Sequence, residues 1–204
     1  MTNSFIAIRG SLLNKSDQIF RILNYEDMGE DMQFEDWSEF NGYLFDNYFE
    51  FANQGIALRG IWMENDWTII NDPEMVDTID EEGLIRLSNH FETEIVTFVI
   101  QTTSSCYGFT VYNKTIKRGF FVSDGEVIDN SYEVLKEEEG VNVNEQAFAD
   151  DILNLAVNFG IDLQGKEKHT YTVKKLSYLD IPEQEFAQQD QQECDNKKPW
   201  WKFW

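Results

Sequence analysis

Residues 94–128, EIVTFVIQTTSSCYGFTVYNKTIKRGFFVSDGEVI, contain three runs rich in β-branched and aromatic residues, separated by short turn signals. The runs are Ile95–Thr102, Tyr107–Tyr112 and Arg118–Val122. Asn113-Lys114 connects the second run to the third. Asp124-Gly125 follows the third run and favours the type I′ turn that matches the twist of tight hairpins. The segment therefore predicts a β-meander that continues through this turn into Val127–Ile128.

Further strand candidates lie before and after the meander. Ile56–Met63 and Trp67–Asn71 are joined by a short polar connection, which indicates a hairpin. Phe5–Arg9, followed by Gly10, is typical of a short first strand. Thr170–Leu176 indicates a last strand, shortly before Pro182.

Four segments repeat apolar residues at helical spacing, and each predicts an amphipathic helix. The first follows Asn14 or Ser16, either of which can cap it, and the second runs through Trp37, Phe40, Leu44, Tyr48 and Phe51, with Gly42 unfavourable in its middle. The third is Glu82–Phe91, and the fourth runs from Asn144 to Phe159, where Gly160 can end it. Helices mixed with consecutive strands predict an α+β fold: a single mainly antiparallel sheet, with a β-meander and helices packed on one side.

Length and composition favour one folded domain with an appendage. The chain has 204 residues, of which 42% are hydrophobic, and this is enough for one core. Residues 1–181 form the expected α+β globular domain. Residues 182–204 read as a flexible acidic and Gln-rich linker that ends in a cationic, Trp-rich peptide, because EQEFAQQDQQECDN contains too little apolar area to offset chain entropy.

The net charge restricts the partners that the chain can have. There are 38 Asp and Glu residues against 16 Lys and Arg, giving a formal net charge of −22. A surface of this sign repels nucleic acid and anionic lipid, so we expect no nucleic-acid partner. The N-terminal stretch does not read as a secretory signal, and no apolar run approaches the length of a membrane span. Together with two widely spaced cysteines, Cys106 and Cys194, this predicts a cytoplasmic protein in which Cys106 is a buried small hydrophobe.

Catalytic and cofactor motifs are missing from the sequence. His90 and His169 lie in no nucleophile or metal motif, and no phosphate-binding glycine pattern occurs. The acids from Asp72 to Glu81 lack calcium-loop spacing, so we interpret them as a solvated helix start. We expect no cofactor and no enzymatic activity. A carboxylate-based enzyme of unknown substrate stays open as an alternative, because many acids are present and a cleft could bring two together.

The segment Tyr25–Phe51 is the most distinctive part of the predicted domain. It contains nine acids and nine aromatic residues but no Lys or Arg. One interpretation is a solvated helix face. The other is a docking surface for a basic protein, in which dense carboxylates steer association and aromatic rings supply anchors. The residues of this candidate surface are Glu35, Asp36, Trp37, Glu39 and Phe40.

The last eight residues, KKPWWKFW, form a small cationic aromatic peptide on a strongly acidic chain. Three interpretations stay open. The peptide can fold back on its own domain or on a second copy, it can bind another protein, or it can contact a membrane, since Trp and Lys together favour the headgroup region. Its candidate contact residues are Trp200, Trp201, Phe203 and Trp204.

The chain resembles bacterial immunity proteins, which are often small, acidic α+β proteins that block basic toxins, in its size, charge and aromatic content. The stretch WTIINDPEMVDTIDEEGLIRLSNHFETEIVTFVIQ, residues 67–101, together with the meander after it, is also similar to small uncharacterised bacterial domains. In those domains a strand–helix–strand unit leads into a hairpin near an Asp-Gly turn. This second resemblance covers residues 60–130, is one of pattern, and carries no functional residue across. The resemblance to immunity proteins implies a non-enzymatic, intracellular protein-binding role of the immunity or inhibitor type.

Overall fold

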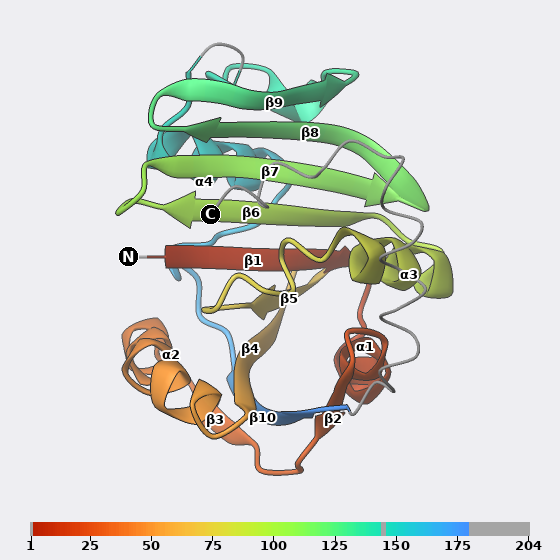
Figure 1. The fold of residues 1–204 in the computed structure, drawn as a ribbon, viewed down its shortest axis with the longest axis vertical. Coiled ribbons are helices and arrows are strands. Elements are labelled where there is room, and N and C mark those ends of the chain that lie inside the picture. The colour runs from red at the N-terminus through yellow and green to blue at the C-terminus, as the bar shows by residue number, and fades with distance from the viewer. Residues whose placement is uncertain (1, 144–145, 180–204) are drawn as a thin grey trace.

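The computed structural model describes residues 2–143 and 146–179, which build one ten-stranded sheet flanked by helices (Figure 1). The strands are β1 (Thr2–Arg9), β2 (Tyr25–Asp27), β3 (Met32–Phe34), β4 (Ile56–Glu64), β5 (Trp67–Asn71), β6 (Ile95–Gln101), β7 (Cys106–Asn113), β8 (Thr115–Ser123), β9 (Glu126–Tyr132) and β10 (Tyr171–Tyr178). The helices in these ranges are α1 (Ser16–Ile22), α2 (Trp37–Ala52), α3 (Glu81–Phe91) and α4 (Ala149–Asn158), with short 3-10 turns η1 (Leu13–Lys15) and η2 (Lys136–Glu138).

The strands follow the order β2-β10-β4-β5-β1-β6-β7-β8-β9, and β3 also pairs with β10. Every pairing is antiparallel. The expected α+β fold with a single mainly antiparallel sheet is confirmed. The expected meander is also confirmed, and it consists of strands β6 to β9. Its last turn has positive φ at both Asp124 and Gly125, as the Asp-Gly signal indicates.

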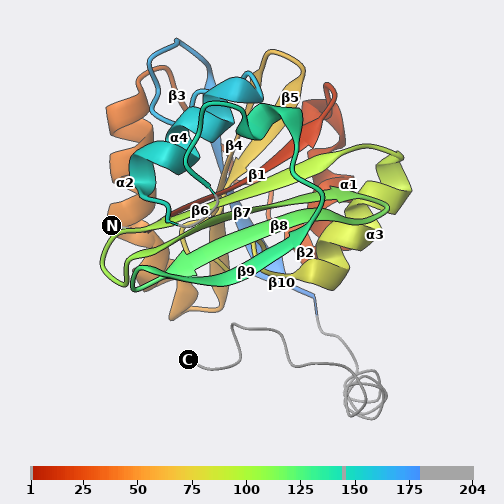
Figure 2. The same cartoon turned by 90° about the horizontal axis from the view of Figure 1, so that it is seen from above.

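Helices cover both faces of the sheet, so the prediction that they pack on one side is wrong. Along β1, Phe5 and Ala7 join the core beneath α2 and α4, whereas Ile6 and Ile8 join the core beneath α1 and α3. Figure 2 shows the two helix pairs on opposite sides of the strands. The physical reason is that the central strands place apolar residues on both faces and are buried at nearly every position, so both faces need a covering layer.

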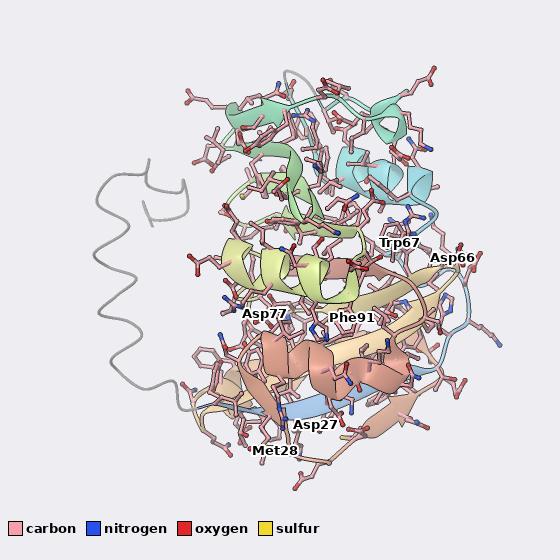
Figure 3. All side chains as sticks on the ribbon, turned by 90° about the vertical axis from the view of Figure 1, so that its right-hand side faces the viewer. Asp27, Met28, Asp66, Trp67, Asp77 and Phe91 are labelled. Atoms are coloured by element: carbon pink, nitrogen blue, oxygen red, sulfur yellow. The ribbon has the colours of Figure 1, made fainter. Side chains whose placement is uncertain are left out.

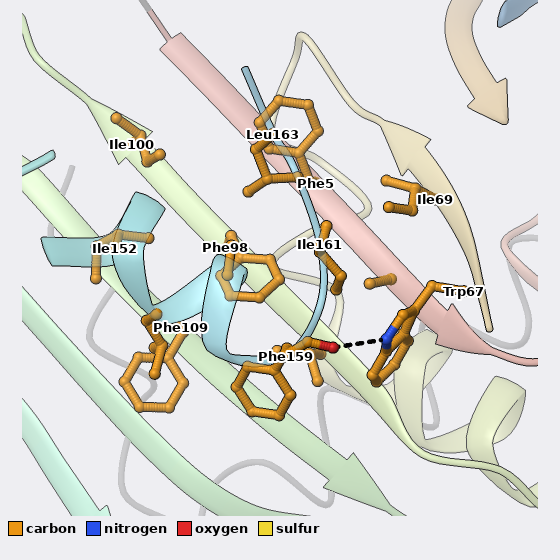
Figure 4. Packing of buried hydrophobic residues seen from close by; sticks show 14 of the residues in the cluster. Phe5, Trp67, Ile69, Phe98, Ile100, Phe109, Ile152, Phe159, Ile161 and Leu163 are labelled. Atoms are coloured by element: carbon orange, nitrogen blue, oxygen red, sulfur yellow. Dashed lines mark hydrogen bonds between the residues drawn. The ribbon is translucent and has the colours of Figure 1, made fainter. Parts of the chain in front are cut away.

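The larger core lies between the sheet and the pair α2 and α4. In Figure 4, Phe98 and Phe109 of the sheet face Ile152 and Phe159, and the indole Nε1 of Trp67 donates a hydrogen bond of 3.0 Å to the carbonyl oxygen of Phe159. This bond satisfies a polar group inside an otherwise apolar layer. It also fixes the C-terminal end of α4 against β5.

Two helix starts differ from the sequence-based expectation. The residue before α1 is Lys15, and neither Asn14 nor Ser16 caps the helix with its side chain. Helix α4 begins at Ala149 instead of near Asn144, and Phe148, the residue before it, is 54% exposed. By contrast, Asp36 and Asp80 cap α2 and α3, because their carboxylates accept the backbone N–H groups of Glu39 and Gly83.

None of the helices in the described ranges combines the length and the apolar character that crossing a membrane requires. Cys106 is buried, as expected, and burial raises the pKa of its thiol to about 11. The expectations for residues 182–204 lie outside the described residues.

Candidate functional site

Helix α2 presents the predicted acidic segment, and its inner face is held on β4 by aromatic packing. Phe40 and Leu44 are completely buried. The ring of Phe40 stacks on Tyr171 with 4.7 Å between centroids and lies 5.8 Å from Trp62. Gly60 of β4 lies directly below, where a Cβ atom would come within 2.3 Å of Phe40. The close approach of α2 to the sheet therefore depends on a glycine.

The N-terminal end of α2 is fixed by Trp37. Its ring lies 5.5 Å from Phe40 and 5.7 Å from Trp62. Gly165, in the loop before β10, adopts a positive φ of 67° beneath this ring, where a Cβ atom would come within 2.1 Å of it. Trp37 is thus partly buried between the helix, the sheet and this loop, and only part of its surface remains available to a partner.

The outer face of α2 carries a row of residues that we call the α2 stripe: Glu39, Gly42, Asp46, Phe49 and Glu50. Steps of three, four and seven residues place these positions on one side of a helix. Glu39, Asp46 and Glu50 are exposed, and Phe49 is 68% exposed although it is aromatic. The stripe therefore combines three carboxylates with one exposed aromatic ring.

The carboxylates of the α2 stripe have no cationic partner within residues 2–143 and 146–179. The two lysines of the neighbouring strand β10 are already used. Lys174 pairs with Asp27 and Asp31 at 2.5 and 3.0 Å, and Lys175 pairs with Glu30 at 2.7 Å. Burial by itself would lower the pKa of Lys174, but its hydrogen bonds to the two aspartates outweigh this and raise it. Asp27, Glu30 and Asp31 therefore each contact a lysine, and the carboxylates of the α2 stripe do not.

The predicted partner-binding residues are placed as follows. Glu35, Asp36 and Glu39 are exposed at the start of α2. Phe40 is fully buried and cannot contact a partner while the domain keeps this fold. The exposed aromatic residue of this helix is instead Phe49, nine positions later, which sequence reasoning did not single out. Trp200, Trp201, Phe203 and Trp204 lie outside the described residues.

Packing within the described structure does not require a glycine at position 42. A Cβ atom added there would meet no atom within 4 Å outside its own helix. A glycine inside a helix is unfavourable by about 0.5–1 kcal/mol relative to alanine. We therefore expect Gly42→Ala to raise the free energy of unfolding by about this amount, measured by urea denaturation. An unchanged or lowered value would contradict the open geometry at this position.

A second group of charged residues is buried, centred on Arg59 of β4. Its side chain has no exposed surface. The guanidinium lies 2.5 Å from Asp77 and 2.6 Å from Glu74, donates to the Tyr25 hydroxyl at 3.0 Å, and lies 3.4 Å from Asp72. In Figure 3, Asp77 lies between α3 and α1. The interpretation of the Asp72–Glu81 acids as a solvated helix start is thus wrong for Asp72 and Asp77, which are 0% and 3% exposed.

Burial sets the protonation of this group, which we call the Arg59 cluster: Tyr25, Arg59, Asp72, Glu74 and Asp77. Desolvation raises the pKa of Asp77 to about 6; the charge of Arg59 opposes this shift, and that of Asp72 adds to it. Burial would lower the pKa of Arg59, but Asp72 and Asp77 outweigh it and raise the value. Asp72 Oδ2 also accepts the backbone N–H groups of Asp77 and Thr78 at 2.8 and 2.9 Å. The cluster fastens the loop before α3 to the sheet.

No family model, curated protein or solved structure matches the chain. The resemblance to immunity proteins therefore stays a prediction, and function is inferred from the chain's own residues.

A third polar group joins Glu64 of β4 to His169. Glu64 is 2% exposed, accepts the backbone N–H of Asp162 and lies 3.6 Å from His169 Nε2. Burial raises the pKa of Glu64, although its hydrogen bonds to Asp162 and Trp62 oppose the shift. Like the Arg59 cluster, this pair connects elements distant in the sequence. A charged residue inside an apolar strand, as in IALRGIWME, is the signal that could have predicted both groups.

A shallow groove of about 490 Å³ lies at the other end of the sheet. Its walls come from the start of β6, the β7–β8 turn and the segment after β9. The lining residues are Glu94, Val111, Asn113, Ile116, Lys117, Tyr132, Glu133 and Leu135. Glu94 is paired with Arg9 at 2.9 Å. Neither Asp77 nor Glu64, whose pKa values are raised by burial, lines this groove.

Proposed function

We propose that the protein is a non-enzymatic binding module, of the inhibitor or immunity type, that uses the α2 stripe to bind a basic protein partner. The observation that carries the proposal is the uncompensated charge of the stripe. Glu39, Asp46 and Glu50 project from one side of a rigidly packed helix with no cation beside them in the described structure. Such an arrangement steers a positively charged partner and selects against acidic ones.

The exposed ring of Phe49 supports a protein partner over a simple counter-ion. Aromatic side chains supply much of the binding energy in protein interfaces when they enter a pocket of the partner. Asp46 and Glu50, three residues before and one residue after Phe49, both lie on one side of it around the helix, so its contact would be flanked by two carboxylates. Helix α2 is also held by buried residues, Phe40 and Leu44, and therefore presents this surface with little ordering cost.

The alternative of a carboxylate-based enzyme needs an acid of shifted pKa that faces a groove. The acids Asp77 and Glu64 have raised pKa values, but they lie in buried polar groups, whereas the groove is lined by other residues. This separation favours the binding role over an enzymatic one.

Charge reversal on the stripe tests the proposal. The triple variant Glu39→Lys, Asp46→Lys, Glu50→Lys is compared with Asp124→Lys, Glu126→Lys, Glu139→Lys, which changes the net charge equally at exposed sites near the opposite sheet edge. Each full-length chain is used for affinity capture from the source cell lysate at low and high salt. We expect a basic protein that the native chain and the control retain, that high salt releases, and that the stripe variant does not retain.

Three outcomes would contradict the proposed function. These are equal retention by both triple variants, a captured protein that is not basic, and the absence of any salt-dependent partner of the native chain. Circular dichroism and thermal melts of both variants establish that the domain stays folded. This is expected, because all six substituted positions are exposed. Asp124 adopts a positive φ of 50°, where lysine is less favourable than aspartate, so the control variant should melt at a somewhat lower temperature than the native chain.

A further inference from the structure

The chain itself contains a peptide whose chemistry matches the α2 stripe. Residues 197–204, KKPWWKFW, supply three lysines, and the stripe supplies three carboxylates without a cation. The peptide also carries four aromatic residues, and the stripe carries the exposed ring of Phe49. The chemistry that suits a basic aromatic partner therefore also suits residues 197–204 of the same chain.

The length of the connecting chain allows this contact. The last described residue is Leu179, and 20 residues, 180–199, separate it from Trp200. A segment of that length spans up to about 70 Å when fully extended. A domain of this size is only about 40 Å across. The peptide can therefore reach α2 from the end of β10 without any change in the domain.

Gly42 gives the stripe a shape that suits an aromatic ring. It lies between Glu39 and Asp46, and the space where a side chain would stand is open. A ring can approach the helix backbone at this point, while lysines on either side meet the carboxylates. The glycine is unfavourable for the helix and unexplained by packing, and a close contact with a bound aromatic residue accounts for it.

The groove near β9 is a weaker match for the same peptide. Of its two glutamates, Glu94 is already paired with Arg9. Lys117 lies in the groove wall and repels a cationic peptide. Glu133 alone would remain as a partner for three lysines. Charge complementarity thus favours α2 over the groove.

We propose that residues 197–204 bind the α2 stripe of the same chain and compete there with the basic partner. The contact itself does not depend on the proposed function; only the competition does. Because the peptide is tethered, its effective concentration at the stripe reaches the millimolar range, so even a weak contact is largely occupied. An external partner must then displace the peptide, and only partners that bind tightly remain bound.

The native cysteines provide a direct test. Cys194 lies three residues before Lys197, and Cys106 is buried with a thiol pKa raised to about 11. A maleimide spin label on the full-length ¹⁵N-labelled chain is therefore directed to Cys194, with Cys106→Ala as a safeguard. We expect paramagnetic broadening of amide signals in α2 and no comparable broadening in β7 to β9. High salt and the tail variant Lys197→Glu, Lys198→Glu, Lys202→Glu should each remove it.

Several results would overturn the proposal. Broadening at the groove residues would place the peptide there, and broadening nowhere would exclude a contact with the domain. Binding to a second copy is tested with a mixture of two chains. One carries the spin label at natural isotope abundance, and the other is ¹⁵N-labelled and carries no spin label. Broadening in this mixture shows that the peptide binds a second copy instead of the same chain. Unchanged broadening in the stripe variant, with the Asp124, Glu126, Glu139 variant as control, would exclude the three carboxylates.

Gly42→Gln tests the shape of the site without removing any charge. Glutamine is a good helix former, and its side chain would fill the open space. We expect weaker broadening of α2 in a protein that is at least as stable as the native one, which a folding defect cannot imitate. Equal broadening would remove Gly42 from the site.

The competition is measured separately with the captured basic protein. The tail variant should bind it roughly threefold or more tightly than the native chain. If the broadening is seen but no basic partner exists, the proposed function fails and the contact stands. If a basic partner binds both chains equally, the competition fails and the proposed function stands.

Discussion

Replacing Arg59 by methionine is expected to lower the free energy of unfolding by about 3–5 kcal/mol. Methionine keeps an unbranched apolar side chain at this position, so most of the loss comes from electrostatics and a smaller part from the atoms removed. Asp72 and Asp77 would remain buried without the guanidinium that lies 3.4 and 2.5 Å from them. Tyr25 would also lose its donor at 3.0 Å. Urea denaturation of the two proteins gives the difference directly.

Arg86→Met is the matched control for this substitution. Arg86 also lies near two acids, Asp80 and Glu82, at 3.8 and 3.9 Å, but 45% of its side chain is exposed. An exposed ion pair contributes about 0–1 kcal/mol. If the two substitutions have equal effects, the Arg59 cluster does not hold the fold together in the way described.

The loss in free energy of unfolding caused by Arg59→Met should be smaller at lower pH. In the folded protein burial raises the pKa of Asp77 from 3.8 to about 6. A carboxyl whose pKa is raised by folding favours the folded state below its unfolded pKa, and this contribution is lost as the pH rises through about 6. Without Arg59 the folded state depends even more on protonated acids. The difference between the variant and the native protein is therefore expected to be smaller near pH 5 than near pH 7, and a constant difference would argue against buried, ionised Asp77.

Gly60→Ala is expected to lower the free energy of unfolding by about 1–3 kcal/mol. The added Cβ would lie 2.3 Å from Phe40 Cζ and 3.0 Å from Leu44 Cδ1. Phe40 cannot move aside easily, because it is fully buried and stacked on Tyr171. The helix must then rise from the sheet, and the α2 stripe moves with it.

The effect of Gly60→Ala should be opposite in sign to that of Gly42→Ala, although the two substitutions are chemically identical. Adding Phe40→Leu is expected to recover part of the loss, because a smaller side chain makes room for the new methyl group. Denaturation of the two single variants and the double variant measures this coupling. Strict additivity would mean that Phe40 is not the residue that Gly60 accommodates.

The parts of the fold that local patterns specify could be predicted from the sequence. The meander, the β4–β5 hairpin and α2 follow from alternation, turn dipeptides and helical spacing, which act over a few residues. Strands β2 and β3 could not be predicted in this way. They are three residues each, lie in an acid-rich segment, and exist because β10 pairs with them and Lys174 pairs with Asp27 and Asp31.

The candidate site was predictable as a region and not residue by residue. Charge counting alone indicates that Glu35, Asp36 and Glu39 belong to the surface, because an acid without a partner in the fold is expected to be exposed to solvent. Helical spacing does place Phe40 with Leu44 on one apolar face and leaves Phe49 outside it, in agreement with their burial and exposure. The docking hypothesis names Phe40 because acids surround it in the sequence, and that criterion does not distinguish a buried ring from an exposed one. Likewise, Arg59 could not be matched with Asp72 and Asp77 before the position of the loop was known.

The position of β10 sets the order in which the protein can be completed during synthesis. Lys174 pairs with Asp27 across 147 positions, and the ring of Tyr171 completes the packing around Phe40. The segments that flank α2 thus leave the ribosome long before the strand that they require, and contacts between such distant residues form late. A nascent chain carries the acids of the stripe without a fixed surface to display them. A partner that recognises this surface meets it only after β10 has been synthesised and has paired with β3 and β4.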